Sequence, residues 1–88
     1  MFRIAISNRA EKALKRYGDS RVRLLELFSV LRDNPVPAEY YDVKKVVGRD
    51  EVYRVRLGGM RVVYGVDWVG KSVVIYEFLP RGRVYKGI

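Results

Sequence analysis

A glycine pair at residues 58–59 separates two runs of alternating side chains, and this arrangement constrains the fold more than any other part of the chain. The runs are residues 53–57 and 60–64. Strict alternation is typical of β-strands with one buried face, and a Gly-Gly pair between two such runs indicates a tight hairpin. A two-residue turn pairs Arg56 with Arg61, whereas a three-residue loop would change the register.

The same alternation predicts further strands on both sides of this hairpin. We expect strands at residues 2–6, 51–57, 60–66 and 72–79, and a short extended piece within a connector at 42–47. The last three strands are joined by turn-forming residues, so they should form an antiparallel meander.

Two helices are predicted between the first strand and this connector. Apolar residues at helical spacing predict a first helix with Asn8 as its N-cap and Glu11 three residues later, ending at Gly18. A second helix follows Asp19-Ser20 and ends at the proline segment 34–37. We therefore expect one α+β domain over residues 1–88, in the order β-α-α-β-β-β. In this fold a two-helix hairpin packs on one face of a mainly antiparallel sheet, and the other face is open.

Histidine and cysteine are both absent from the 88 residues. Their absence excludes disulfides, a thiol nucleophile and thiolate metal sites, and it removes the usual general base. Asp67 and Glu77 are too isolated for a two-carboxylate site. We therefore expect neither a metal nor a cofactor. No run reaches the ~18 apolar residues of a membrane span, and the N-terminus lacks an apolar signal segment, so we expect a cytoplasmic protein without membrane contact.

The chain carries a net charge of +8, and the charge is uneven. Residues 44–88 hold ten basic and four acidic side chains, whereas residues 1–43 hold eight and six. A basic surface favours a polyanionic partner, either a nucleic acid or an acidic protein. The alternative is a set of solvated arginines on the surface of a heat-adapted protein.

Three arginines of the predicted hairpin share one face. Arg54, Arg56 and Arg61 lie there together with Val63, and no carboxylate lies between residues 52 and 66. Like charges directly opposite each other destabilise a sheet by a few tenths to about 1 kcal/mol. Guanidinium groups donate paired hydrogen bonds to phosphate oxygens. This pattern therefore favours a phosphate-binding face over a merely solvated one.

The C-terminal tail adds further candidates. Arg81 and Arg83 flank a glycine, and a strand beside the hairpin would bring them to the same face. Tyr85 either stacks on a base, as aromatic side chains do in RNA sites, or packs the C-terminus. Lys44 and Lys45 are more often solvated than functional.

Five short motifs resemble the RelE branch of the RelE/ParE toxin superfamily, and its archaeal members most closely. They are KVVG at 45–48, YRVRL at 53–57, GMRVVY at 59–64, PRGR at 80–83 and the tyrosine at 85. Each motif is weak alone, but their order and spacing cover nearly the whole chain. The resemblance implies a RelE-like fold and a toxin that cuts messenger RNA in the ribosomal A site, without a metal. It also implies a small RelB-like antitoxin as partner.

The resemblance further implies roles for individual residues. Those implied for catalysis are Arg61, Arg81 and Tyr85, and those implied for RNA binding are Arg54, Arg56, Arg83 and Lys45. The family's two basic strand positions hold lysine in the best-known bacterial form and arginine here, and arginine is a poor base. Two alternatives stay open: a ParE-like gyrase inhibitor, and a non-catalytic module that binds nucleic acid or protein.

Overall fold

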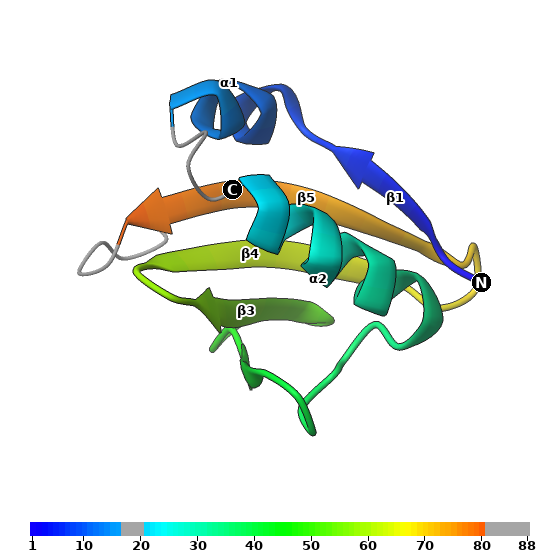
Figure 1. Cartoon of the computed structure of the whole chain (residues 1–88). Coiled ribbons are helices and arrows are strands. Elements are labelled where there is room, and N and C mark those ends of the chain that lie inside the picture. The colour runs from blue at the N-terminus through cyan, green and yellow to red at the C-terminus, as the bar shows by residue number, and fades with distance from the viewer. Residues whose placement is uncertain (17–20, 81–88) are drawn as a thin grey trace.

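The computed structural model describes residues 1–16 and 21–80 (Figure 1). Its elements are β1 (Arg3–Ile6), α1 (Asn8–Arg16), α2 (Arg21–Asp33), β2 (Asp42–Lys45), β3 (Val52–Leu57), β4 (Met60–Asp67) and β5 (Ser72–Pro80). The predicted architecture of two helices on a mainly antiparallel sheet is confirmed. The predicted first-helix stop at Gly18 and the predicted cap at Asp19-Ser20 lie outside the described residues.

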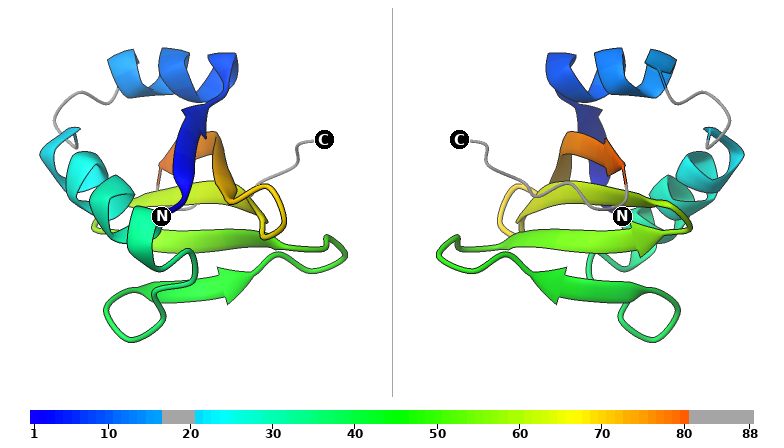
Figure 2. Two further views of the ribbon diagram at one scale, coloured as in Figure 1. Left: turned by 90° about the vertical axis from the view of Figure 1, so that its right-hand side faces the viewer. Right: turned by 90° about the vertical axis from the view of Figure 1, so that its left-hand side faces the viewer.

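The sheet has five strands in the order β1-β5-β4-β3-β2. Strand β1 runs parallel to β5, and the other neighbours are antiparallel. The extended piece predicted within the connector is a full edge strand, β2, which pairs with β3. Only four residues form this strand, so its alternation is a weak sequence signal. Figure 2 shows that β2 carries the sheet one strand beyond the meander.

The predicted hairpin register is confirmed. Leu57 pairs with Met60 and Arg56 with Arg61, so the turn has two residues. Gly58 has a φ of 62°, and a positive φ is typical of a tight hairpin turn. Every second residue of β3 and β4 therefore faces the helices, and the residues between them face the other way.

The core lies between the sheet and the two helices. In Figure 1, α2 crosses in front of the sheet and α1 lies beside β1 and β5. Fully buried side chains from α2 meet fully buried side chains from the strands, among them Leu24, Leu27 and Leu31 on the helix and Val55, Val62 and Ile75 on the sheet. The buried Tyr64 hydroxyl donates a 2.7 Å hydrogen bond to the Pro35 carbonyl, which ties the segment after α2 to the sheet.

The N-cap of α1 is Ser7 and not Asn8. Ser7 Oγ accepts a hydrogen bond from the Ala10 backbone N–H at 3.0 Å, and the Ser7 hydroxyl donates to the Tyr76 carbonyl at 2.9 Å. The Ser7 backbone N–H donates to the Ile75 carbonyl at 3.0 Å. In a capping box a glutamate would hold this N–H, but here β5 accepts it, so the prediction of Asn8 with Glu11 was wrong by one residue.

Candidate phosphate-binding site

The face of the sheet opposite the helices carries the predicted arginines. Arg54 and Arg56 project from β3 and Arg61 from β4, and Arg56 lies directly opposite Arg61. Strand β2 adds two residues that the sequence did not single out for this face: Asp42 pairs with Arg56, and Lys44 pairs with Arg54. The result is a surface of four cations and one carboxylate on three adjacent strands.

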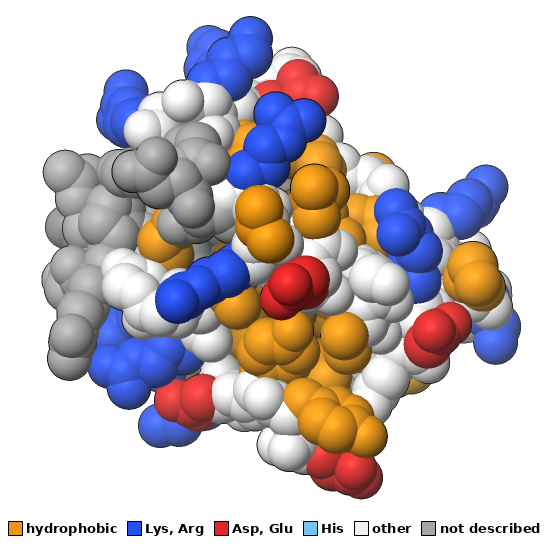
Figure 3. Space-filling model, in the orientation of Figure 1, with side chains coloured by type: hydrophobic (Ala, Val, Ile, Leu, Met, Phe, Trp, Pro, Cys, Tyr) orange, Lys and Arg blue, Asp and Glu red, His pale blue; other side chains and the backbone are white. Residues whose placement is uncertain are grey.

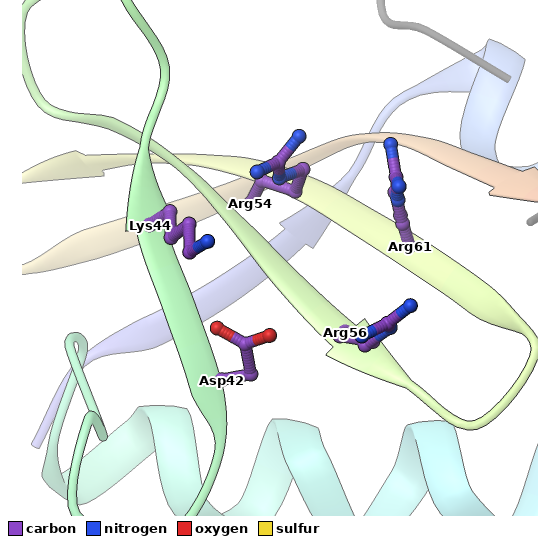
Figure 4. A pocket seen from close by; sticks show the side chains of 5 residues that line it. All are labelled: Asp42, Lys44, Arg54, Arg56 and Arg61. Carbon is purple, nitrogen blue, oxygen red and sulfur yellow. The ribbon is translucent and has the colours of Figure 1, made fainter. Parts of the chain in front are cut away.

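These five side chains line one hollow. Its volume is about 90 Å³, and its lining consists of Asp42, Lys44, Arg54, Arg56 and Arg61. Figure 4 shows the five side chains on one side of the ribbons of β2, β3 and β4. A single water needs about 10–15 Å³ of such space, so the hollow is large enough for several waters or for a group of phosphate size. We refer to this set of five residues as the arginine pocket.

Lys44, and not Lys45, lies in the arginine pocket. Lys45 pairs with Tyr53 and so belongs to the face that carries the core. There it lies near Glu51, and its positive charge helps to lower the pKa of that carboxyl group. The alternation of Asp42, Val43 and Lys44 places both charged residues on one face of β2, and the pairing of β2 with β3 makes this the face that carries the arginines.

Val63 shares the arginine face, as predicted, but it is fully buried. Its cross-strand neighbours are Arg54 on β3 and Glu77 on β5. Beyond Val63, the aromatic ring of Tyr76 lies over Gly65, since a Cβ atom added at Gly65 would be 2.8 Å from that ring. Tyr76 therefore packs against the sheet, on the face away from the helices.

The other carboxylates near this face have structural partners. Glu77 Oε2 lies 3.4 Å from Arg9 Nε, and Asp67 Oδ1 accepts a 2.9 Å hydrogen bond from the Gly70 backbone N–H. Within residues 1–16 and 21–80 no group of three acidic side chains is arranged to hold a metal ion. Arg81, Arg83 and Tyr85 lie outside the described residues.

The helix-covered face differs in character. A second hollow of about 250 Å³ lies there, lined mainly by apolar side chains of β1, α1 and α2, with Arg21 and Arg32 among them. Val22 and Leu25 of α2 are exposed. Figure 3 shows apolar side chains on this face interspersed with basic and acidic ones. Neither described helix is long and apolar enough to cross a membrane.

The fold and the pocket together define a small basic protein with four cations gathered on the open face of its sheet. No family model matches the chain. It is 40% identical to RelE1 of Methanocaldococcus jannaschii over 86 residues, which cover 97% of this chain and 96% of that protein. The chain belongs to the RelE toxin family.

Solved structures agree with this assignment. RelE in the RelE–RelB complex from Pyrococcus horikoshii superposes with a TM-score of 0.81 and is 39% identical, covering 94% of this chain and 98% of that one. The isolated Escherichia coli RelE toxin superposes with a TM-score of 0.78 over 96% of this chain and 88% of that one. At 22% identity, the bacterial likeness shows the fold alone.

Proposed function

We propose that this protein is the toxin of a type II toxin–antitoxin system and a ribosome-dependent endoribonuclease that cuts messenger RNA in the A site. The arginine pocket is the observation that carries the proposal. It gathers Arg54, Arg56 and Arg61 on an open sheet face, in a hollow that can accept a phosphate group. Membership of the RelE family makes messenger RNA the preferred source of that phosphate.

The chemistry uses the charge of the arginines. In metal-free RNA cleavage the ribose 2′-hydroxyl attacks the adjacent phosphate, and negative charge grows on the phosphoryl oxygens. Preorganised donors aimed at those oxygens stabilise the transition state by several kcal/mol, and losing one such donor costs roughly 10²–10³ in rate. We assign this role to Arg61 and Arg81. Support for Arg81 is its place in the sequence, directly after Pro80, which pairs with Met60 beside Arg61.

The remaining assignments concern RNA binding. Arg54, Arg56 and Arg83 hold the phosphodiester backbone, and Tyr85 stacks on a base or carries a proton. Lys45, which lies on the other face of β2, contacts the RNA outside the arginine pocket. The assignments for Arg54 and Arg56 are supported by their positions in the arginine pocket. Those for Arg83, Lys45 and Tyr85 are supported by the sequence resemblance.

Dependence on the ribosome follows from what the chain lacks. No histidine is available as an acid or a base near neutral pH. An external scaffold that holds the RNA in an in-line geometry compensates, because correct orientation alone contributes several kcal/mol to such reactions. The free protein should therefore be a feeble nuclease.

We assign the protein to the cytoplasm and expect a RelB-like antitoxin as its partner. RelE from Pyrococcus horikoshii forms a complex with RelB. The net charge of +8 favours an acidic inhibitor, and the exposed apolar side chains of α2 offer it additional contact area.

Primer extension on messenger RNA in programmed ribosomes with an empty A site tests the proposal. The wild-type protein should cut within the A-site codon, and Arg61→Ala should reduce the rate roughly 10²–10³-fold. Arg16→Ala, which removes an exposed arginine at the end of α1, is the charge-matched control and should cut normally. If the wild-type protein binds ribosomes or RNA without cutting, the protein is a non-catalytic binding module and not an enzyme.

A further inference from the structure

One carboxylate lies among the cations of the arginine pocket. Asp42 is the first residue of β2 and pairs with Arg56, which in turn pairs with Arg61 on β4. The three residues therefore form one row across three adjacent strands, with Asp42 at the edge of the sheet. Figure 4 shows the Asp42 carboxylate on the same side of the sheet as the Lys44 and Arg56 side chains.

Among the described residues, none forms an ion pair or hydrogen bond with this carboxylate that would hold the fold. In the described part of the chain no ion pair joins Asp42 to Lys44, Arg54 or Arg56, and its side chain is exposed. Glu77 and Asp67 differ from it, because each has a structural partner. Asp42 thus lies inside the hollow, and its carboxylate oxygens accept no hydrogen bond from residues 1–16 or 21–80.

We propose that Asp42 is the general base of the cleavage reaction and accepts the proton of the attacking 2′-hydroxyl. This inference rests on the proposed function. As the 2′-oxygen bonds to phosphorus, its proton passes to an Asp42 carboxylate oxygen and then to solvent. The bond from phosphorus to the 5′-oxygen breaks, and that oxygen takes a proton from water. The products are a 2′,3′-cyclic phosphate and a 5′-hydroxyl, so neither oxidant nor metal is consumed.

The row of three residues suits an in-line displacement. Neighbouring strands lie about 4.8 Å apart, so the backbones at Asp42 and Arg61 are separated by about 10 Å. If a phosphate is held over Arg56 with its 2′-oxygen on the β2 side, that oxygen lies next to Asp42, and Arg61 faces the phosphoryl oxygens from the β4 side. Because β2 is the edge strand, the RNA can continue past Asp42 without crossing another strand.

A carboxylate also fits the side-chain inventory. Arginine remains protonated throughout the accessible pH range and cannot act as a base. Among the five pocket residues, only Asp42 can accept a proton without first losing one from a cation. Aspartate and glutamate are established general bases, and such a base contributes roughly 10²–10⁴ in rate.

The test compares Asp42→Asn, Asp42→Glu and Asp33→Asn in single-turnover A-site cleavage at saturating protein. Asp33→Asn removes an equal charge from the end of α2, on the helix-covered side. We expect Asp42→Asn to slow cleavage roughly 10²–10⁴-fold. Asp42→Glu should keep a measurable part of the rate, and Asp33→Asn should keep all of it. The Asp42→Asn defect should shrink from about pH 6 to about pH 9, because hydroxide then replaces the missing base.

Binding is measured separately on messenger RNA with a 2′-O-methyl group in the A-site codon, which cannot react. Asp42→Asn should bind this RNA at least as tightly as the wild type, because a negative charge has been removed from the pocket. That result also shows that the variant is folded. An Asp42→Asn rate within about threefold of wild type, while wild type cuts normally, overturns the role of Asp42 and leaves the proposed function intact. Absence of cleavage by the wild type removes both.

Discussion

Trp68 Nε1 donates a 2.6 Å hydrogen bond to Glu51 Oε2, which joins the turn before β3 to the turn after β4. The same carboxylate oxygen accepts a 2.8 Å bond from the Tyr53 hydroxyl. These two donors, and the charge of Lys45, hold the pKa of Glu51 below its ordinary value of 4.5. Trp68 in turn packs edge-to-face on Phe2, with ring centroids 5.5 Å apart. Glu51 therefore links both turns to the N-terminal segment.

Acid should release this link. Because the pKa of Glu51 is lower in the folded state, its hydrogen bonds stabilise the fold above pH 4.5, and this stabilisation is lost as the pH falls through the folded-state pKa. Trp68 is the only tryptophan in the chain, so its fluorescence reports on the contact. We expect an emission change with a midpoint below pH 4.5 that Glu51→Gln abolishes. If Glu51→Gln shows the same acid-induced change in emission as the wild type, another group is responsible for that change.

Gly65 should be needed for the close approach of Tyr76. A Cβ at residue 65 would lie 2.8 Å from the outer atoms of the ring, so Gly65→Ala must push this half-buried side chain aside, at a cost of roughly 0.5–1.5 kcal/mol in free energy of unfolding. In a Tyr76→Ala background the same change should be neutral or stabilising, because alanine is favoured over glycine within a strand by roughly 0.5–1 kcal/mol. Denaturant unfolding of the four proteins measures this coupling. Equal costs in both backgrounds would exclude the ring as the cause.

The arginine face could be predicted from the sequence because the residues that determine it are close together in the chain. The Gly-Gly turn and the alternation around it determine the pairing of Arg56 with Arg61, and the structure has that pairing. The position of Asp42 is not local information. It depends on how β2, which comes from a connector of weak pattern, aligns with β3, and this alignment places Asp42 opposite Arg56. Residues 52–66 contain no carboxylate, and the carboxylate of the pocket comes from outside this span, on β2.

The start of α1 shows the same limit. Ser7 and Asn8 are both good N-cap residues, and sequence preference does not separate them. The choice is made by β5, whose carbonyl groups at Ile75 and Tyr76 accept hydrogen bonds from the Ser7 backbone N–H and hydroxyl. A tertiary contact thus decides a local feature.

This difference predicts unequal effects of two alanine substitutions. Ser7→Ala removes the cap on Ala10 and the bond to Tyr76, and it should lower the free energy of unfolding by about 1 kcal/mol or more. Asn8→Ala, an exposed position inside the helix, should change it by less than about 0.5 kcal/mol. Urea unfolding followed by circular dichroism compares them. If Asn8→Ala lowered the free energy of unfolding more than Ser7→Ala does, Asn8 and not Ser7 would be the N-cap.

The arginine pocket should also reveal itself in the salt dependence of RNA binding. Each phosphate neutralised on a single strand contributes about −0.7 to the slope of log K against log salt concentration. Replacing Arg54, Arg56 or Arg61 by alanine should therefore flatten that slope by about 0.7 each. Arg16→Ala, at the end of α1, should leave it unchanged, because its side chain is not part of the pocket. Anisotropy titrations of a short unstructured RNA over a range of salt concentrations measure the slopes. If all four variants shifted the slope equally, net charge alone would bind the RNA, and the pocket would have no special role in holding phosphate.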